Sequence, residues 1–537
     1  MPVTRRSLLA GMAKLGGAGA VYETLAAWDF LQPPPAMAAS LALPKESGRG
    51  KTVAILGAGI SGLCAAYELD RAGYDCIILE ATRRAGGRSL TLRRGDGFRE
   101  TGDSELQVCN FDEGLWLNAG PGRIPHHHVH VIDYCRRFGV PLQPYIFASR
   151  GNLVHSGSLG NGRTMQVREV LYALQGQVAE LLDKCIQKGG LDLPVTGEDV
   201  DKLHEMLVQF GDLSKPEAAN RNAAWSYANQ SGRAGLDLPA GVATPYKPLS
   251  PMKLEEILRS RVWDDWIFRD ADIYWQTSLL EPVGGMDNFY KGFLRQPLTR
   301  QLGAIEGLIR YGARVTAIDV RADKVAVAFE DGGAQRALET DFCISTIPTP
   351  LLAKLPSNLP AAFLAAAELP WVAAGKVGWQ AERFWERDAQ IYGGISWTTD
   401  TIDQIWYPSE GYLSAKGVLT GGYMRARDAI AFNARPVAER LHIAREQGER
   451  LHPGFANYVQ HGLAIGWNRM EFAHSGWANE EDARFGANAT VLAQPQGRFH
   501  VAGDQITFLS GWQEGALVAA WHAVAAIDRQ ARPSGGG

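Results

Sequence analysis

Apolar and polar positions follow the most regular order between residues 51 and 88 of the chain. Residues 52–56 form a short apolar run of β-forming residues, which predicts a buried parallel strand. A proline-free stretch that we expect to be helical continues to about Ala72, and a second apolar run covers residues 76–79. A strand, a helix and a strand in this order predict one βαβ unit of a parallel sheet.

Three glycines occupy the turn between the first strand and the helix. Gly57, Gly59 and Gly62 have G-x-G-x-x-G spacing, and the acidic Glu80 follows about 20 residues later, at the end of the second apolar run. The first glycine allows a tight turn, the second lets the backbone approach a pyrophosphate, and the third lets the helix pack closely on the strand. The N–H groups and the dipole of the helix then hold the phosphates, and Glu80 accepts hydrogen bonds from ribose hydroxyls. The unit predicts a dinucleotide cofactor but does not separate NAD from FAD.

Later segments add a helix, a loop and further strands. Helical apolar spacing over 165–185 predicts a helix, whereas 212–252 is rich in Asn, Ser, Gly and Pro and predicts a long surface loop. A polar turn at Asp323 and Lys324 separates two strand-like runs. The expected strands and a C-terminal helix fall in 314–328, 341–347, 499–504 and 511–528.

Composition is that of an ordinary globular protein. The length of 537 residues suggests two or three domains. Hydrophobic residues make up 46% and charged residues 21%, and the net charge of −4 gives no basis for a nucleic-acid or anionic-membrane partner. The sequence has no uninterrupted apolar run of about 18 residues, so we expect no membrane span.

The first 39 residues differ from the rest of the chain. Arg5 and Arg6 precede a weakly apolar stretch rich in Gly and Ala, and small residues end the segment near Ala39. This pattern resembles a twin-arginine export signal, which carries folded proteins and predicts a periplasmic or secreted location. The alternative is a disordered N-terminal arm, and the protein is then expected in the cytoplasm.

Five motifs in sequence order resemble the L-amino acid oxidase branch of the FAD-dependent amine oxidases. The first is the glycine unit with its continuation Gly86-Gly87-Arg88, which is similar to the second glycine motif of that superfamily. The other four are NAGPGRIP at 118–125, EPVGGM at 281–286, the stretch 376–385, and the C-terminal Gly503-Asp504 with GWQEGA at 511–516. The resemblance covers nearly all of the chain after the N-terminal segment and implies FAD as the cofactor.

The resemblance also implies the fold. It is an α/β fold with a Rossmann-like FAD-binding domain of the glutathione-reductase type, assembled from separated segments, with an inserted α+β substrate domain and a helical subdomain. The expected divisions are 1–39 for the signal or arm, 50–118 plus 283–348 plus 490–532 for the FAD-binding domain, 119–165 plus 349–489 for the substrate-binding domain, and 166–282 for the helical subdomain and entrance loop.

Arg123 is the main candidate for substrate recognition. It lies in a turn rich in Gly and Pro, where a rigid backbone would aim the side chain, and a guanidinium is a natural bidentate partner of a carboxylate. In the L-amino acid oxidases the arginine of this motif binds the substrate α-carboxylate, so the resemblance implies the same role here. The alternative is an ion pair that holds the loop in place.

The resemblance implies three further catalytic residues. Tyr407 matches a tyrosine whose hydroxyl contacts the carboxylate, and an ordinary core tyrosine is the alternative. Trp512 resembles the aromatic wall beside the flavin ring. Lys376 matches a lysine near the reactive nitrogen of the flavin that works in reoxidation by dioxygen, and a solvated lysine is the alternative. Other tryptophans could complete the wall: Trp406, Trp467 and Trp477.

The cofactor contacts are implied by the same motifs. Val315 matches the strand that holds the adenine, Asp504 the acid beside the ribityl and pyrophosphate groups, and Gln513 the helix start under the flavin. The full set expected to bind FAD is Gly57, Gly59, Gly62, Glu80, Gly87, Arg88, Gly122, Arg123, Val315, Gly503, Asp504, Trp512 and Gln513.

A run of histidines follows the Arg123 loop and suggests metal binding at first sight. His126, His127 and His128 are consecutive, so they cannot all face one ion, and no set of Cys or acidic ligands accompanies them. We therefore expect no metal site, and we expect the run to cap or begin a helix.

These observations together predict an L-amino acid oxidase with non-covalent FAD. The substrates are an L-amino acid and dioxygen, and the products are a 2-oxo acid, ammonia and hydrogen peroxide. A homodimer or higher homo-oligomer is expected. An amine or polyamine oxidase, an amino-acid 2-monooxygenase, a carbon–carbon desaturase and a flavin-carrying structural protein are the alternatives.

Overall fold

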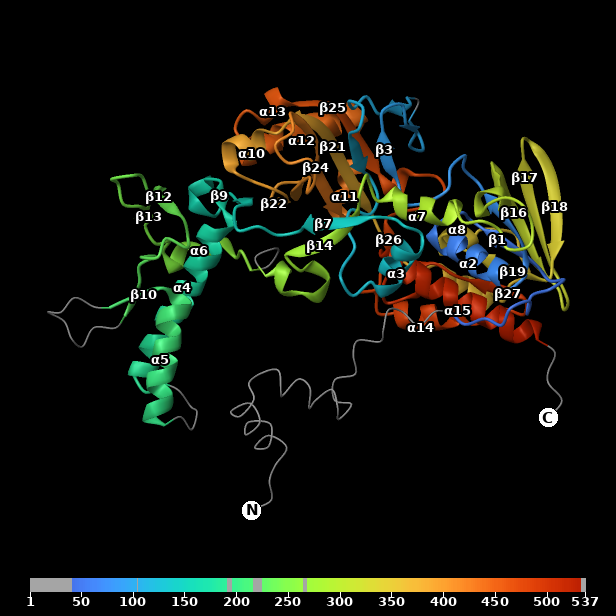
Figure 1. Ribbon diagram of the computed structural model, residues 1–537, viewed down its shortest axis with the longest axis horizontal. Coiled ribbons are helices and arrows are strands. Elements are labelled where there is room, and N and C mark those ends of the chain that lie inside the picture. The colour runs from blue at the N-terminus through green and yellow to red at the C-terminus, as the bar shows by residue number, and fades with distance from the viewer. Residues whose placement is uncertain (1–40, 104, 191–195, 216–224, 264–267, 533–537) are drawn as a thin grey trace, which may run out of the picture.

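The computed structural model describes residues 41–103, 105–190, 196–215, 225–263 and 268–532, so the predicted export signal lies outside the described residues. Its first sheet is parallel and has five strands (Figure 1). In spatial order these are β15 (Ile309–Tyr311), β2 (Asp75–Glu80), β1 (Thr52–Leu56), β19 (Phe342–Ser345) and β27 (Phe499–Val501). This sheet is the α/β core that the sequence predicts.

Two helices pack against each other beside this sheet. Nearly every residue of α2 (Ile60–Arg71) is buried, as expected for a helix that is covered on all sides. The alanine-rich α15 (Gln513–Ala531) packs along α2. An antiparallel sheet of β16 (Ala313–Val320), β17 (Val325–Asp331) and β18 (Ala334–Thr340) lies at the edge of this domain (Figure 1).

A second sheet of seven strands forms the other half of the body. Its order is β25 (Val459–Gly466), β21 (Ala374–Glu382), β24 (Lys416–Arg425), β23 (Gln404–Tyr407), β22 (Gly394–Thr398), β8 (Leu153–His155) and β9 (Met165–Gln166). Most of these strands were not predicted. Strand β21 is buried at eight consecutive positions and contains two glycines, so it shows neither polar alternation nor an unbroken β-forming run.

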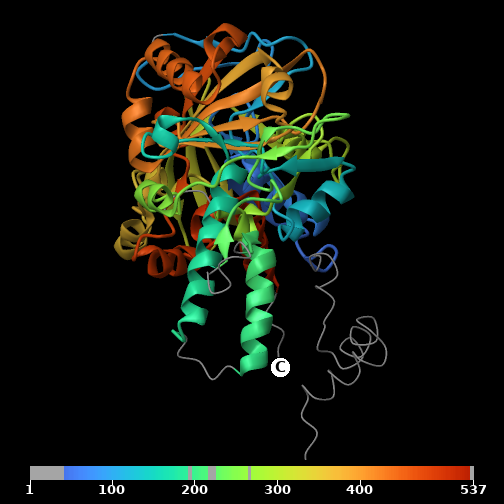
Figure 2. The ribbon, with the colours of Figure 1, turned by 90° about the vertical axis from the view of Figure 1, so that its left-hand side faces the viewer.

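Two long helices project from the body as an arm (Figures 1 and 2). They are α4 (Val167–Gln187), which confirms the predicted helix, and α5 (Gly197–Gly211), which was not predicted. The helices approach closely at Gly211, where an added Cβ would lie 2.3 Å from the Cβ of Ala179. The expected loop 212–252 contains two short antiparallel pairs of strands: β10 (Leu213–Ser214) with β11 (Ser226–Tyr227), and β12 (Leu236–Leu238) with β13 (Lys247–Pro248). Helix α6 (Leu254–Ser260) follows the loop.

Shorter elements connect these layers. Paired strands are β3 (Thr91–Arg93) with β6 (Trp116–Asn118), β4 (Gly97–Phe98) with β5 (Gln107–Val108), β7 (Leu142–Ile146) with β14 (Ser278–Pro282), and β20 (Trp371–Val372) with β26 (Trp477–Ala478). Further helices are α3 (Val129–Arg137), α7 (Asp287–Leu294), α8 (Thr349–Leu352), α9 (Ala361–Ala367), α10 (Phe384–Ala389), α11 (Ala426–Asn433), α12 (Val437–Leu451), α13 (Phe455–Tyr458) and α14 (Phe485–Ala493).

The two sheets draw on different parts of the chain. All strands of the five-stranded sheet lie within 50–118, 283–348 and 490–532, and those of the seven-stranded sheet lie within 119–165 and 349–489, apart from the last residue of β9. The boundaries of the domains as independent units stay a prediction.

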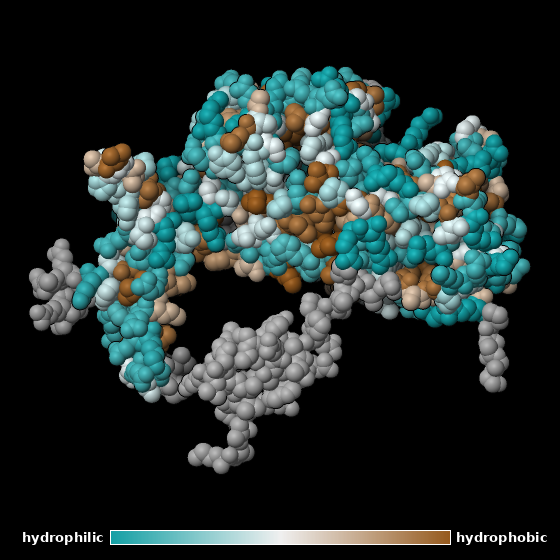
Figure 3. Space-filling view, in the orientation of Figure 1, coloured by the Kyte–Doolittle hydropathy of each residue, from teal (hydrophilic) through white to brown (hydrophobic). Residues whose placement is uncertain are grey.

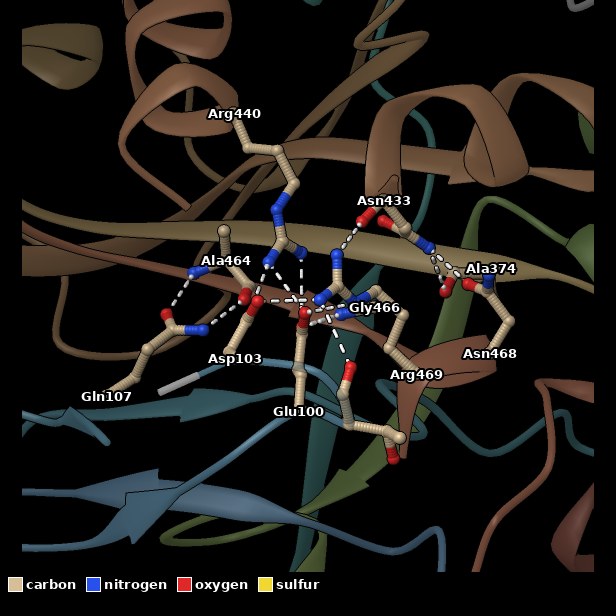
Figure 4. Close-up of polar contacts among 11 residues, drawn as sticks. Glu100, Asp103, Gln107, Ala374, Asn433, Arg440, Ala464, Gly466, Asn468 and Arg469 are labelled. Carbon is tan, nitrogen blue, oxygen red and sulfur yellow. Dashed lines mark hydrogen bonds and ion pairs between the residues drawn. The ribbon is translucent and has the colours of Figure 1, made fainter. Parts of the chain in front are cut away.

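A buried ion-pair network fastens the segment between β4 and β5 to the second sheet (Figure 4). The side chains of Glu100 and Arg440 are fully buried and joined by two hydrogen bonds of 2.6 and 3.1 Å. The carboxylate of Glu100 also accepts a 2.6 Å hydrogen bond from the backbone N–H of Gly466. Arg469 lies 3.4 Å from Glu100 and 2.6 Å from Asp103, so two acids balance two arginines.

We expect Glu100→Gln to destabilise the protein by about 3–5 kcal/mol, because the substitution leaves the buried guanidinium of Arg440 without its main counter-ion. Glu439→Gln is the matched control, since Glu439 lies on the same helix as Arg440 but pairs with Arg435 at the surface, and that pair should contribute less than about 1 kcal/mol. The measurement is the urea midpoint of unfolding of each purified protein. Equal midpoints for the two variants would show that the buried network is no more important than a surface pair.

Candidate active site

The glycine turn between β1 and α2 has the geometry that its spacing predicts. Gly57 has φ 107° and donates a 2.8 Å hydrogen bond to Leu79 O. At Gly62 an added Cβ would lie 2.1 Å from Gly57 O, so only glycine lets the helix start this close to the strand. At Gly59 an added Cβ would meet no atom within 4 Å, which leaves this backbone open to a bound group.

Glu80 ties the end of β2 to the same turn. One carboxylate oxygen accepts a 2.8 Å hydrogen bond from Ala58 N. The other accepts hydrogen bonds of 2.9 and 2.7 Å from the N–H and hydroxyl of Thr82. Val315 lies on β16, which packs against β2, so it belongs to the same end of the domain.

Two motifs that are distant in the sequence meet beside the glycine turn. An added Cβ on Gly87 would lie 3.3 Å from the Cα of Gly59, so the two glycine motifs are in contact. Arg88 forms a two-point ion pair with Asp504, which also accepts a 2.8 Å hydrogen bond from Gly511 N. Gly503, which precedes Asp504, has φ 118°.

Unpaired polar atoms in this region fit a large polar cofactor. Gln513, the first residue of α15, donates a 3.0 Å hydrogen bond to Ser89 Oγ, but its Oε1 atom is buried without a hydrogen-bond partner. The buried hydroxyl of Ser61 on α2 also has no partner. Because buried polar groups are normally hydrogen-bonded, these atoms and the open glycine backbone suit a dinucleotide.

Arg123 is a buried cation surrounded by aromatic rings. Its Cζ atom lies 4.5 Å from the ring centre of Trp275, 4.6 Å from that of Trp406 and 5.2 Å from that of Phe147. The Nε and Nη1 atoms have no hydrogen-bond partner, and burial lowers the pKa of the guanidinium. In the described part of the chain no carboxylate pairs with Arg123, so an ion pair that holds the loop does not explain this residue.

Lys376 is held beside Arg123 and is not solvated. Its side chain is 3% exposed, and Nζ donates hydrogen bonds of 2.9 and 2.6 Å to the carbonyls of Asn118 and Gly120. Burial and the nearby Arg123 charge hold the pKa of Lys376 well below its usual value. The same ring of Trp406 lies 4.5 Å from Nζ, so one indole contacts both cations.

Gly120 and Gly122 allow close approaches within the loop that carries Arg123. An added Cβ would lie 2.0 Å from Arg88 O at Gly120, and 2.8 Å from Cζ3 of Trp406 at Gly122. The loop is thus pressed between the Arg88 motif and the second sheet. Gly122 lies beside the Arg123 site in this arrangement, and its contact with FAD stays a prediction.

Tyr407 differs from its expected placement. Successive side chains of β23 point to opposite faces, and Trp406 occupies the face toward Arg123. The hydroxyl of Tyr407 instead donates a 2.7 Å hydrogen bond to Ser396 Oγ and lies 2.5 Å from His452 Nε2. This residue fits the core alternative rather than a contact with the substrate carboxylate.

A tyrosine that the sequence analysis missed faces Arg123. Tyr145 lies on β7, two residues before Phe147, which directly follows the strand and whose ring contacts Arg123. Its hydroxyl is buried without a hydrogen-bond partner, and burial raises the pKa of Tyr145 to about 12 although the charge of Arg123 opposes the shift. The alternating aromatic residues Tyr145 and Phe147, about 20 residues after the Arg123 motif, were the sequence signal that could have indicated this site.

Trp512 lies in an aromatic wall. Its ring centre is 4.9 Å from that of His128, 5.5 Å from Trp275 and 5.9 Å from Tyr274. Trp406 completes the wall at Arg123. The other two candidates lie nearby: Trp467 donates a 3.0 Å hydrogen bond to Ala119 O, and the ring of Trp477 lies against Gly511.

Comparison with known proteins gives the family. Residues 60–528 match the family described as flavin containing amine oxidoreductase. The chain belongs to this family. The predicted FAD-dependent oxidoreductase with an α/β fold is thereby confirmed.

None of the helices that the structure describes is long and apolar enough to cross a membrane, and the described residues contain no group of three or more His, Cys, Asp or Glu placed to hold a metal ion.

Similar proteins include several named oxidases. The flavin-dependent L-tryptophan oxidase RebO of Lentzea aerocolonigenes is 28% identical, over 89% of this chain and 98% of that protein. The putative L-amino-acid oxidase YobN of Bacillus subtilis (strain 168) is 26% identical over 87% and 92%, and the L-amino-acid oxidase of Protobothrops flavoviridis is 25% identical over 90% of each.

Solved structures of amine oxidases share the fold. Cyclohexylamine oxidase from Brevibacterium oxydans IH-35A has a TM-score of 0.57 and 18% identity, over 89% of this chain and 99% of that chain. Putrescine oxidase with bound putrescine has a TM-score of 0.54 and 18% identity, over 89% and 98%.

We expect Glu80→Ala to weaken FAD binding about 10- to 100-fold, because the carboxylate both orders the glycine turn and offers acceptors to ribose hydroxyls. The dissociation constant is measured by flavin fluorescence during reconstitution of the apoprotein. Glu339→Ala is the control, since Glu339 is exposed and pairs only with Arg321 among its described contacts. Equal FAD affinity in the two variants would show that Glu80 does not contribute to cofactor binding.

Proposed function

We propose that the protein is an L-amino acid oxidase, which converts an L-amino acid and dioxygen into a 2-oxo acid, ammonia and hydrogen peroxide. The observation that carries the proposal is the unpaired guanidinium of Arg123, buried next to the aromatic wall of Trp512. A buried cation without a counter-ion is unfavourable, and a substrate carboxylate would neutralise it.

The arrangement around Arg123 supports two contacts to the carboxylate. Arg123 offers unpaired N–H groups, and Tyr145 offers an unpaired hydroxyl close to the same guanidinium. Hydrogen bonds to an ionised group are stronger than neutral ones, so both donors would fix the substrate. Tyr145 takes the role that the sequence analysis had given to Tyr407.

The remaining residues of the site fit the chemistry of such an oxidase. Bound FAD would supply the acceptor for the α-hydride of the substrate and pass the electrons on to dioxygen. Trp512 and its neighbours exclude water and orient the α-carbon. Lys376 uses two of its three N–H donors on loop carbonyls, which leaves one for a water near the flavin. Water then hydrolyses the released imino acid.

The names of the similar proteins favour amino acids over simple amines. Three of the curated relatives are named as L-amino-acid or L-tryptophan oxidases, whereas the amine oxidase structures are similar at 18% identity and speak for the fold alone. An amine oxidase remains the second candidate and would have no use for the free donors of Arg123. An amino-acid 2-monooxygenase would give an amide and carbon dioxide.

Location and assembly are part of the proposal. The twin-arginine-like segment supports export to the periplasm or secretion. A homodimer or higher oligomer is supported by apolar side chains on the arm that are about half exposed: Val178, Leu181, Met206 and Phe210. Figure 3 shows apolar residues on the surface of the arm among hydrophilic ones. Cell fractionation and light scattering of the purified protein test these two points.

Arg123→Lys keeps the charge but loses the planar guanidinium, and we expect kcat/KM for L-amino acids to fall about 30- to 4,000-fold. A peroxide assay with L-amino acids, D-amino acids and simple amines gives this number and tests the function itself. FAD content and melting temperature should stay constant, and D-amino acids should be inert. Rapid oxidation of simple amines at the same rate by the wild-type protein and by Arg123→Lys would instead identify an amine oxidase.

Tyr145→Phe should raise KM for L-amino acids about tenfold or more, since one hydrogen bond to the carboxylate is lost. Tyr407→Phe is the matched control. The Tyr407 hydroxyl donates to Ser396 and its side chain lies on the face of β23 away from Arg123, so its loss should not change KM. Steady-state kinetics on both variants decide between the two tyrosines. A raised KM in Tyr407→Phe alone would restore the role first expected for Tyr407.

A further inference from the structure

A cavity with a volume of about 270 Å³ lies between helix α12 and the edge of the seven-stranded sheet. Helix α12 packs on β25 and β21 in this part of the molecule (Figure 1). Four residues at helical spacing form the wall on α12: Ala438, Leu441, His442 and Arg445. No residue of the Arg123 loop, the glycine turn or the aromatic wall lines this cavity, so it is separate from the candidate active site.

A β-bulge shapes the wall on the sheet. The pairing of β21 with β25 shifts by one residue there, so that Trp379 on β21 faces two residues of the edge strand β25, His461 and Gly462. An added Cβ on Gly462 would lie 2.4 Å from Cζ3 of Trp379, so only glycine lets the indole lie this close to the strand.

His461 has an unusual backbone conformation for its residue type. It is the first residue of the bulge and has φ 55°, in the left-handed region, a position that glycine occupies in one common type of bulge. A side chain at such a position adds strain, and bulges are frequent beside functional sites, where they re-aim a side chain. The imidazole of His461 therefore lines the cavity at an energetic cost that glycine would avoid.

The cavity combines an apolar surface with basic side chains. The indole of Trp379 is 2% exposed, and Cζ of Arg445 lies 5.0 Å from its ring centre. A guanidinium stacked on an aromatic face keeps its N–H donors free at its edge. Among the described residues Arg445 has no ion pair, and the side chains that line the cavity include no acid. With His442 and His461, three basic side chains surround the indole.

The buried ion-pair network of Figure 4 holds the two walls together. The carboxylate of Glu100 binds both Arg440, which lies on α12, and the backbone N–H of Gly466, the last residue of β25. Helix and strand are thus fixed relative to each other by the chain itself. A ligand would have little backbone to order on binding, which favours affinity.

We propose that this cavity is a second ligand site, which binds a small organic anion built on a planar ring, such as a single-ring aromatic carboxylate. The ring would lie against the indole of Trp379, and the carboxylate would accept hydrogen bonds from Arg445 and His461. An anion without a ring would leave the apolar surface uncovered, and a neutral ring would leave the basic side chains unmatched. The proposal does not depend on the oxidase function, since the two sites share no residue.

Isothermal titration calorimetry of the holoenzyme with benzoate tests the site. Arg445→Gln should weaken the binding about tenfold or more, because a charge-assisted hydrogen bond is lost. Arg450→Gln is the matched control and should not change the affinity, since Arg450 lies on the same helix but pairs with Asp400 and does not line the cavity. Equal benzoate affinity in Arg445→Gln and the wild-type protein would overturn the proposal.

Two further probes separate the ring from the charge. Benzamide keeps the ring without the charge, and inorganic phosphate keeps a charge without the ring. Each should bind about three- to tenfold more weakly than benzoate, because each lacks one of the two contributions. Phosphate that binds as tightly as benzoate would identify a plain anion site and contradict the proposed ligand class.

Benzoate is a carboxylate and can also enter the proposed substrate site, so the titration is repeated on Arg123→Lys. The binding that depends on Arg445 should persist there with the same affinity. Loss of all benzoate binding in Arg123→Lys would place the ligand at Arg123 and overturn the second site. Persistent binding in a protein that oxidises no L-amino acid would support the second site and overturn the proposed function alone.

His461→Gly removes the imidazole but suits the bulge, since glycine adopts φ 55° without strain. The fold should be kept, as the melting temperature will show, and the affinity for benzoate should fall about three- to tenfold. Unchanged affinity would show that His461 does not contact the ligand and would overturn its part in the proposal.

Discussion

The backbone carbonyls of Asn118 and Gly120 both accept hydrogen bonds from the buried ammonium group of Lys376, and the position of Arg123 depends on this contact. The other side of the loop lies against the carbonyl of Arg88, at a distance that only glycine allows. One short stretch therefore touches the Arg88 motif and the seven-stranded sheet at once. Displacing it would disturb both regions together.

The same site keeps two cations, Arg123 and Lys376, out of water: aromatic faces surround Arg123, and Lys376 has the ring of Trp406 in addition to its two carbonyl partners. Cation–π contacts recover only part of the lost hydration, and the lowered pKa of Lys376 reports the remaining cost. An anionic group that enters the site relieves this unfavourable electrostatic state. The proposed carboxylate recognition would therefore rest on a charge imbalance that the chain's own buried residues create.

Sequence reasoning found the parts of the fold with strong local signals. The strand at 52–56, its glycine turn and helix α4 follow from apolar runs and spacing. Strand β21 carried no such signal, because it is buried on both faces, and α5 was missed although a Thr-x-x-Asp capping box precedes it. At the site, Arg123 and Lys376 were found through motifs. On β23, Trp406 and not its neighbour Tyr407 contacts Arg123, because neighbouring strand residues point oppositely, and the short motif around Tyr407 did not reveal this one-residue difference.

Glu514 belongs to the first turn of α15, and its carboxylate accepts hydrogen bonds from the backbone N–H groups of His130 and Val131 in the first turn of α3. Two helix N-termini with positive dipole ends thus converge on one negative charge. This makes the two helices a single mechanical unit, with Trp512 at the start of one and His128 at the start of the other. A substitution that shifts the start of α3 would therefore also shift the start of α15 and the Trp512 side chain there, so the two helices would tolerate change only together.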